Sequence, residues 1–117
     1  MDKILKIGLV GCGFISDYYV ENIKKSKELK IISCYDIDKK RLEEFSKYHE
    51  INSSKNFKEI LENNDIDLIL NLTPPKEHYR VIKKSLKYGK NVYSEKPLTL
   101  DIKKTEELLK LCKEKNL

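Results

Sequence analysis

The stretch Ile7-Gly8-Leu9-Val10-Gly11-Cys12-Gly13-Phe14-Ile15-Ser16 decides the fold of this chain. Residues 4–10 form a short apolar run that ends at a glycine, which predicts a buried β-strand. Every fourth residue from 15 to 23 is then apolar or aromatic, so a helix is expected over about 14–26. A strand, a glycine turn and a helix follow one another, and this local order suits the binding of a pyrophosphate.

The same alternation continues along the chain of 117 residues. Further strands are predicted at 30–35, 50–52, 66–72 and 91–94, of which 50–52 is weak. Helical patterns lie between them, and five alternations of strand and helix demand a parallel sheet with helices on both faces. We therefore predict an α/β fold, a doubly wound parallel sheet of strand order 3-2-1-4-5, in one domain that occupies residues 1–117.

The last helix is predicted to begin after Asp101, whose side chain can cap it. Its buried stripe is expected to consist of Ile102, Thr105, Leu108, Leu109 and Cys112. In the predicted order, strands 1 and 4 are neighbours whose helices lie on opposite faces, and ligands bind in the crevice at such a switch point. The loops 11–16, 73–78 and 95–98 therefore gather at one edge of the sheet.

The glycine turn is the first candidate site. Gly11 allows the tight turn, and Gly13 lets the backbone approach a pyrophosphate at the positive end of the helix. Cys12 contributes a small side chain, and Phe14 and Ile15 open the helix beside the ligand. Ser16 stands at the third position of the glycine pattern, where its size suits packing and its hydroxyl is a candidate phosphate contact.

Asp36 is expected at the carboxyl end of the second strand, where a carboxylate can accept hydrogen bonds from the adenosine ribose. Its charge repels a 2′-phosphate and so favours NAD over NADP. Ile37 is a further candidate cofactor contact. Arg41 is another, and it can soften that repulsion, so NADP stays possible. Alternatively, Asp36 only caps the next helix.

Two loops complete the candidate site. Thr73, Pro74 and Pro75 have few backbone donors and form a rigid wall for the nicotinamide half of the cofactor. His78 falls in the first turn of a helix, where it either packs against this loop or contacts a ligand; the only other histidine, His49, is expected at the surface.

The segment Glu95-Lys96-Pro97 decides the class of chemistry. A residue before proline is held in extended geometry, so the direction of Lys96 is fixed by the backbone. Its ammonium can orient a substrate hydroxyl or join a proton relay, and Glu95 can hold it in position. Without other information, a charged turn between strand and helix explains the segment equally well.

Composition excludes other classes. The net charge is +5, but lysine and glutamate alternate along the predicted helices, so we expect no nucleic-acid partner. No apolar run reaches the roughly 18 residues of a membrane span, and no secretory leader is visible. The three cysteines lie far apart, which predicts no metal site and no disulfide framework. A cytoplasmic location is the default expectation.

The ordered set of motifs resembles the amino-terminal half of the glucose–fructose oxidoreductase/inositol dehydrogenase (Gfo/Idh/MocA) family. It consists of the Gly8-x-x-Gly11-x-Gly13 turn, Asp36, the 73–78 loop, Gly89-Lys90-Asn91-Val92 and Glu95-Lys96-Pro97. The resemblance covers nearly the whole chain and implies a Rossmann domain that binds NAD or NADP. It also implies hydride transfer to or from a sugar, polyol or related small substrate.

The resemblance further implies that Lys96 is the catalytic lysine and that its bond to Pro97 can be cis. Pro75 departs from the family, since many members have asparagine there. The family would continue with a sixth strand and a second domain, which supplies the other catalytic groups and which we expect to be absent here. We therefore expect cofactor binding without turnover, an exposed edge on the last strand, and a homo-oligomer at full length.

Two readings from other classes stay open at this stage. A non-catalytic dinucleotide-sensing module would keep the glycine turn and Asp36 and have no need of Lys96. A methyltransferase that uses S-adenosylmethionine also pairs a glycine turn with a ribose-binding acid, but it leaves the 73–75 loop and Lys96 without a role.

Overall fold

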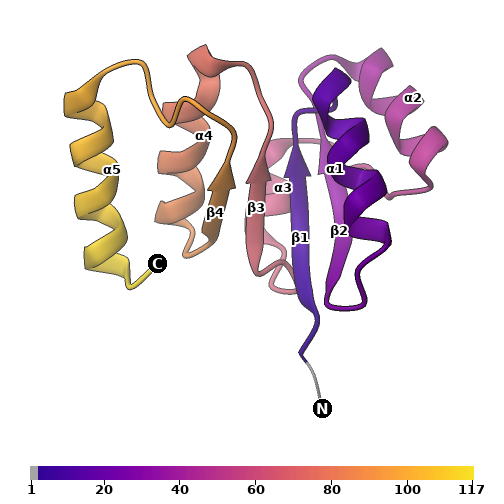
Figure 1. Ribbon diagram of the computed structural model, residues 1–117, viewed down its shortest axis with the longest axis horizontal. Helices are drawn as coiled ribbons and strands as arrows, with labels where there is room; N and C mark the ends of the chain where they lie inside the picture. Colours follow the sequence, from indigo (N-terminus) through magenta and orange to yellow (C-terminus); the bar gives the residue numbers. More distant parts are fainter. Residues whose placement is uncertain (1–2) are drawn as a thin grey trace.

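The computed structural model describes residues 3–117 as a four-stranded parallel sheet of order β2-β1-β3-β4. The strands are β1 (Leu5–Val10), β2 (Leu29–Tyr35), β3 (Leu68–Asn71) and β4 (Asn91–Ser94). All strand pairs are parallel, and the carboxyl ends of the strands lie along one edge of the sheet (Figure 1). The predicted α/β class and doubly wound topology are confirmed.

Five helices follow the strands, one after each strand except β2, which is followed by two. They are α1 (Phe14–Lys24), α2 (Lys39–His49), α3 (Phe57–Glu62), α4 (Pro75–Lys87) and α5 (Ile102–Lys115). Helices α1 and α2 pack on one face of the sheet around Leu9 and Val20, and α3 and α4 pack on the other around Ile60 and Ile69. Both faces of the central strands are therefore buried, as parallel sheets require.

The predicted third strand is wrong. Residues 52–54 make one isolated bridge to β2, between Ser53 and Cys34, rather than a strand. Two backbone hydrogen bonds, Cys34 N to Asn52 O and Ser54 N to Cys34 O, both of 2.9 Å, hold this segment beside β2. The run of Asn and Ser residues has low β propensity, which keeps the pairing to a single bridge. The predicted strands 4 and 5 correspond to β3 and β4.

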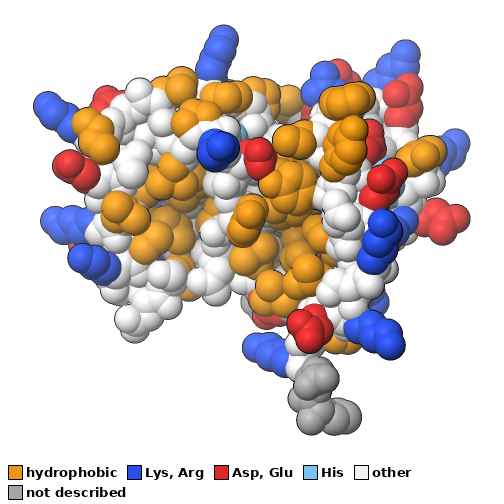
Figure 2. All heavy atoms as spheres, viewed as in Figure 1, with side chains coloured by type: hydrophobic (Ala, Val, Ile, Leu, Met, Phe, Trp, Pro, Cys, Tyr) orange, Lys and Arg blue, Asp and Glu red, His pale blue; other side chains and the backbone are white. Residues whose placement is uncertain are grey.

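The predicted stripe of α5 is only partly correct. Leu108 is buried against α4, whereas Ile102 and Leu109 are 71% and 54% exposed. Figure 1 shows α5 at one end of the sheet, beside α4, and Figure 2 shows hydrophobic side chains across this part of the surface. The helix cap is confirmed, because the Asp101 side chain accepts a hydrogen bond from Lys103 N.

Candidate functional site

The glycine turn between β1 and α1 has the geometry that its sequence predicts. Gly11 has φ +101°, and a Cβ there would lie 2.5 Å from the backbone carbon of Leu72. Gly13 has ordinary φ, and a Cβ there would meet nothing within 4 Å. Gly11 is thus required by the protein itself, whereas the space beside Gly13 is open to a ligand.

Helix α1 begins at Phe14 and has no side-chain cap at Gly13. The first amides of a helix have no intrahelical acceptor and carry the positive end of the dipole, so this end can hold an anion. Phe14 and Ile15 are 83% and 41% exposed beside it. Ser16 is buried and donates to Gly11 O at 2.5 Å, so its hydroxyl serves the turn rather than a phosphate.

Cys12 has a packing role in this turn. Its side chain is buried, and its pKa is raised well above the ordinary value by its contact with Cys34 and by burial. Since the thiolate is the reactive form of cysteine, the neutral thiol is unsuited to nucleophilic or redox chemistry.

Asp36 connects the turn to the end of β2. The side chain is 7% exposed; Oδ2 accepts from Cys12 N at 2.8 Å, and Oδ1 accepts from Asp38 N at 2.7 Å. The Nη1 atom of Arg41 lies 3.7 Å from Asp36 Oδ2, and the Arg41 side chain is half-exposed. The capping role that we weighed for Asp36 belongs to Asp38, whose side chain accepts from Arg41 N. Each carboxylate oxygen of Asp36 can accept further bonds, so the ribose role remains open to test.

Two hollows lie near this end of the sheet, and one of them, of about 350 Å³, borders the Asp36 carboxylate. Its lining includes the exposed Ile37, the basic Lys39 and Lys55 and the acidic Glu43. It offers an apolar contact and charges of both signs beside Asp36. These features suit an adenosine.

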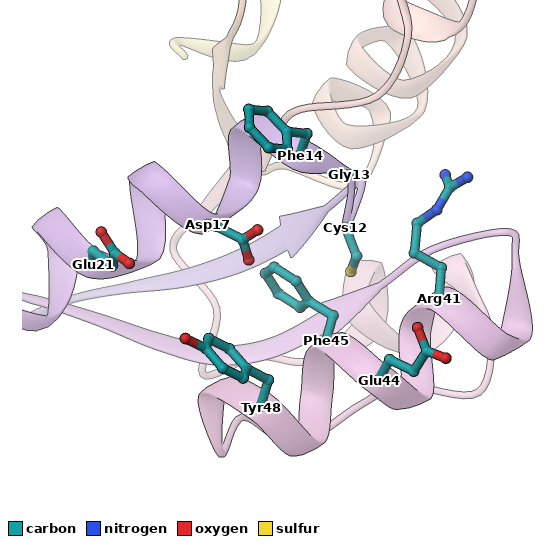
Figure 3. A pocket seen from close by; sticks show the side chains of 9 residues that line it. All are labelled: Cys12, Gly13, Phe14, Asp17, Glu21, Arg41, Glu44, Phe45 and Tyr48. Carbon is teal, nitrogen blue, oxygen red and sulfur yellow. The ribbon is translucent and has the colours of Figure 1, made fainter.

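The larger hollow, of about 610 Å³, lies between α1 and α2. Figure 3 shows Asp17 and Glu21 on α1 facing Phe45 and Tyr48 on α2, with the Arg41 side chain directed away. Its lining combines Cys12, Gly13 and Phe14 of the glycine turn and Arg41 with the carboxylates of Asp17, Glu21 and Glu44.

The Thr73–Pro75 loop is held by a buried polar network. The Asn71 side chain, fully buried, accepts from Thr73 Oγ1 at 2.6 Å and donates to Ser94 Oγ at 3.2 Å. Pro74 and Pro75 are exposed at the start of α4. His78 is 1% exposed, and its ring nitrogens contact Pro97 O and Thr73 O.

The Glu95-Lys96-Pro97 turn follows β4, and the Lys96–Pro97 bond is cis, as the resemblance implied. The Lys96 side chain is exposed at the sheet edge. The expectation that Glu95 holds Lys96 is wrong, because Glu95 Oε2 accepts from Tyr19 Oη at 2.5 Å. The hydrogen bond to Glu95, together with burial, raises the pKa of Tyr19 to about 12.

The candidate residues thus form one connected rim. Gly11 abuts Leu72 and Thr73, His78 joins Thr73 to Pro97, and Asp36 binds the glycine turn. Tyr19 ties α1 to the lysine turn across 76 positions of sequence. The chemistry available at this rim is an anion-binding helix end, a buried carboxylate and a free ammonium group.

Several residues escaped sequence reasoning. Asn71 and Ser94 end the two adjacent strands, and their polar character at these ends was the available signal. His49 is buried, not at the surface, with Nε2 2.6 Å from Asp17 Oδ1. Tyr19 was recognised only as part of the inner face of a helix.

Two properties of residues 3–117 bear on other functions. No group of three or more His, Cys, Asp or Glu side chains is placed to hold a metal ion among these residues. Within the same range, every helix is too short or too polar to cross a membrane.

The sequence of this chain matches a protein family and several curated proteins. Residues 5–117 match the family model described as "Oxidoreductase family, NAD-binding Rossmann fold". An uncharacterized oxidoreductase of Bacillus subtilis, YrbE, is 29% identical over 110 residues, which are 93% of this chain and 32% of YrbE. The dTDP-3,4-didehydro-2,6-dideoxy-alpha-D-glucose 3-reductase of Saccharopolyspora spinosa is 30% identical over 118 residues, covering 100% of this chain and 36% of the reductase.

The fold has solved counterparts. The crystal structure of GenD2 from gentamicin A biosynthesis, in complex with NAD, superposes with a TM-score of 0.93 at 20% identity, covering 100% of this chain and 34% of GenD2. This likeness shows the fold. The chain spans about a third of the length of the curated relatives described above.

Proposed function

Since the chain belongs to the oxidoreductase family with an NAD-binding Rossmann fold, we propose that it is the cofactor domain of an enzyme that transfers hydride between NAD and a CH–OH group. One observation carries the proposal. A glycine turn open to an anion, a buried carboxylate at the next strand end and an exposed lysine lie on one connected rim. The binding of NADP in place of NAD remains possible through Arg41.

The roles follow from position. The turn Gly11–Ile15 binds the pyrophosphate through its backbone amides, and Asp36 accepts from the adenosine ribose beside Ile37 and Arg41. Thr73, Pro74 and Pro75 border the nicotinamide half. His78 lies behind this wall and contacts the loop rather than the cofactor.

Lys96 is the proposed catalytic residue. A bound nicotinamide would accept a hydride from the substrate carbon in the oxidative direction, and the hydroxyl proton would then need an acceptor. The ammonium form of Lys96 can donate a hydrogen bond to the hydroxyl oxygen and so orient it, and its neutral amine form can accept the proton and pass it to solvent. In the reductive direction the same group polarises the carbonyl oxygen.

The substrate class is a sugar, polyol or related small molecule. The support is the name of the Saccharopolyspora spinosa relative, a reductase of a keto sugar nucleotide. We further propose a cytoplasmic location and a homo-oligomeric full-length protein, on composition and on the family resemblance. Nucleic acid and membranes are not proposed as partners.

The 117-residue chain is expected to bind NADH without measurable turnover. Positioned acid–base groups contribute about 10²–10⁴-fold to a rate, and Lys96 is the one catalytic group of this kind that we propose on the described rim. Detectable NADH oxidation by this chain with a keto sugar, followed at 340 nm, would contradict this expectation.

Binding is tested by titrating NADH and NADPH against the chain with fluorescence or calorimetry, with S-adenosylmethionine as the competing ligand class. Gly13→Val is the informative variant, because its Cβ enters space that is empty in the protein but needed by a pyrophosphate. Gly89→Asn is the matched control, since Gly89 also has open space and its φ of +79° suits asparagine. We expect NADH binding to be lost in the first variant and kept in the second.

An equal loss in both variants, or tighter binding of S-adenosylmethionine than of NADH, would overturn the proposal. A dinucleotide-sensing module is the second candidate, because such a module uses the glycine turn and Asp36 and has no need of Lys96. Lys96→Ala in the full-length protein separates the two: an enzyme loses activity, and a sensor keeps its function.

A further inference from the structure

His78 makes two contacts that a neutral histidine cannot satisfy together. The residue lies in the first turn of α4 and is 1% exposed. Its Nδ1 lies 2.5 Å from Pro97 O, and its Nε2 lies 2.7 Å from Thr73 O. The ring therefore spans the two loops that carry the proposed nicotinamide wall and the proposed catalytic lysine.

Both partners are backbone carbonyl oxygens, which only accept hydrogen bonds. A neutral imidazole has one N–H donor and one nitrogen with a lone pair, whereas the imidazolium has two donors. With a neutral ring, one lone pair would face a carbonyl oxygen at hydrogen-bonding distance, and that contact would open. Only a ring in which both nitrogens donate satisfies the two carbonyl contacts together.

We propose that His78 is a positioning residue that, as a doubly protonated imidazolium, locks the Lys96–Pro97 turn to the Thr73 loop. The proposal deepens the proposed function and rests on it for the role of Lys96. Pro97 has no N–H, so its carbonyl is its one backbone group for hydrogen bonding, and that group binds His78. Release of this contact would free the segment that follows Lys96.

A charged His78 ring interacts with the ionisable groups of the neighbouring segments. The ionisable groups in the segments that contact the ring are Glu95 and Lys96 in the loop after β4, and Lys76 and Glu77 on its own helix. The Glu95 carboxylate is engaged by Tyr19, and the Glu77 carboxylate lies 2.8 Å from Arg80. Burial opposes a charged ring, and two charge-assisted hydrogen bonds offset that cost.

The consequence concerns cofactor binding. When the ring loses its second proton, it keeps one carbonyl contact and gives up the other, so the two loops are no longer fixed to each other. The affinity for a dinucleotide should then fall by about fivefold, the effect of one positioning hydrogen bond. The fall should follow the ionisation of His78 and of no other group.

The direct test needs no cofactor. The chain has two histidines, so ¹⁵N spectra of the imidazole rings of the 117-residue chain contain two sets of signals, with His49 as the internal reference. We expect both nitrogens of His78 to show imidazolium shifts at pH 6. On raising the pH, the amides of Thr73 and Leu98 should move with the same midpoint as the ring.

A single neutral tautomer of His78 in the folded chain at pH 6 would overturn the proposal. So would a titration of the ring that leaves the amides of Thr73 and Leu98 unmoved. His78→Gln is the functional variant, since glutamine offers one donor group and one acceptor; its NADH affinity should lack the pH dependence of the natural chain. If no variant binds NADH at any pH, the proposed function fails, while the ring signals still decide the charge state.

Discussion

Tyr19 lies outside the local motifs and still helps to position the candidate site. Its hydroxyl donates to Glu95 and links the helix that follows the glycine turn to the strand end that carries Lys96. Its ring also meets Tyr93 edge-on, with centroids 6.5 Å apart. Loss of this contact would loosen the lysine turn at Glu95, as loss of the His78 contact would loosen it at Pro97.

The Tyr19 hydroxyl also predicts a pH dependence of stability. Its pKa is raised to about 12 in the folded chain, chiefly by the hydrogen bond to Glu95, against 10.0 for the ordinary side chain. Between these two pKa values the Tyr19 hydroxyl is ionised in the unfolded chain and neutral in the folded chain. The free energy of unfolding therefore falls as the pH rises from about 10 to about 12. Because the side chain is only half-buried, we expect a fall on the order of 1 kcal/mol.

The measurement is urea unfolding of the natural chain and of Tyr19→Phe at pH 8 to 11. The variant should lose less stability than the natural chain over this range, since ionisation of other groups cancels in the difference. Tyr48→Phe, at a tyrosine that is 77% exposed, is the control and should behave like the natural chain. Identical slopes for the Tyr19 variant and the control would refute the prediction.

At the scale of elements, the turn between β1 and α1 separates the two roles of glycine. Gly11→Ala places a Cβ 2.5 Å from the Leu72 backbone at a φ of +101°. Strain of this kind costs about 1–3 kcal/mol, and the clash adds to it. We expect the free energy of unfolding to fall by at least about 2 kcal/mol.

Gly13→Ala is the matched comparison. It has ordinary φ and open space, so its free energy of unfolding should change by less than about 1 kcal/mol. Urea unfolding of both variants measures the change in the free energy of unfolding. Equal costs at the two positions would show that the turn is not built as described.

Lys90 joins two elements from the start of β4. Its side chain is 7% exposed, and Nζ donates to Asn63 O and Ile66 O, both at 2.6 Å, in the connection before β3. Lys90→Met would leave these carbonyls without that donor, at a cost of about 1–3 kcal/mol. Thermal or urea unfolding measures this, with Lys87→Met on the surface of α4 as the control.

Burial lowers the pKa of Lys90 in the folded chain. Between this lowered pKa and the ordinary value of 10.5, the Lys90 amine is therefore protonated more in the unfolded chain than in the folded chain. The contribution of Lys90 to the free energy of unfolding rises with pH in that window. The pH dependence of stability due to Lys90 is thus opposite in sign to that due to Tyr19. Lys90→Met should remove the rise, and an unchanged pH dependence in the variant would contradict the attribution to burial.

How much the sequence predicts depends on the range of the interaction. Gly11, Gly13 and the Asp101 cap follow from local spacing, and the structure places them as expected. The partners of Glu95 and His49 lie far away in sequence, at Tyr19 and Asp17, and no period or spacing indicates them. The segment 50–52 was misread because a single bridge needs little β propensity, so the local signal could not distinguish a bridge from a strand.

At the scale of the whole molecule, the two edges of the sheet differ. The outer edge of β2 is partly covered by residues 52–54 through their bridge to Cys34, whereas β4 pairs only with β3 among residues 3–117. Beside this free edge, Tyr93, Ile102 and Leu109 are all more than half exposed. Unpaired strand edges next to apolar surface favour association with another strand.

We therefore expect the 117-residue chain to self-associate through β4 and α5. Sedimentation equilibrium should show a mass that rises with concentration. The double variant Ile102→Lys/Leu109→Lys places charges one heptad apart on one face of α5 and should weaken association at least about tenfold, since it places charge on an apolar contact. Tyr48→Lys, on the exposed surface of α2, is the control and should leave the association unchanged. A monomer at all concentrations, or equal weakening by both variants, would show that this edge is not the contact.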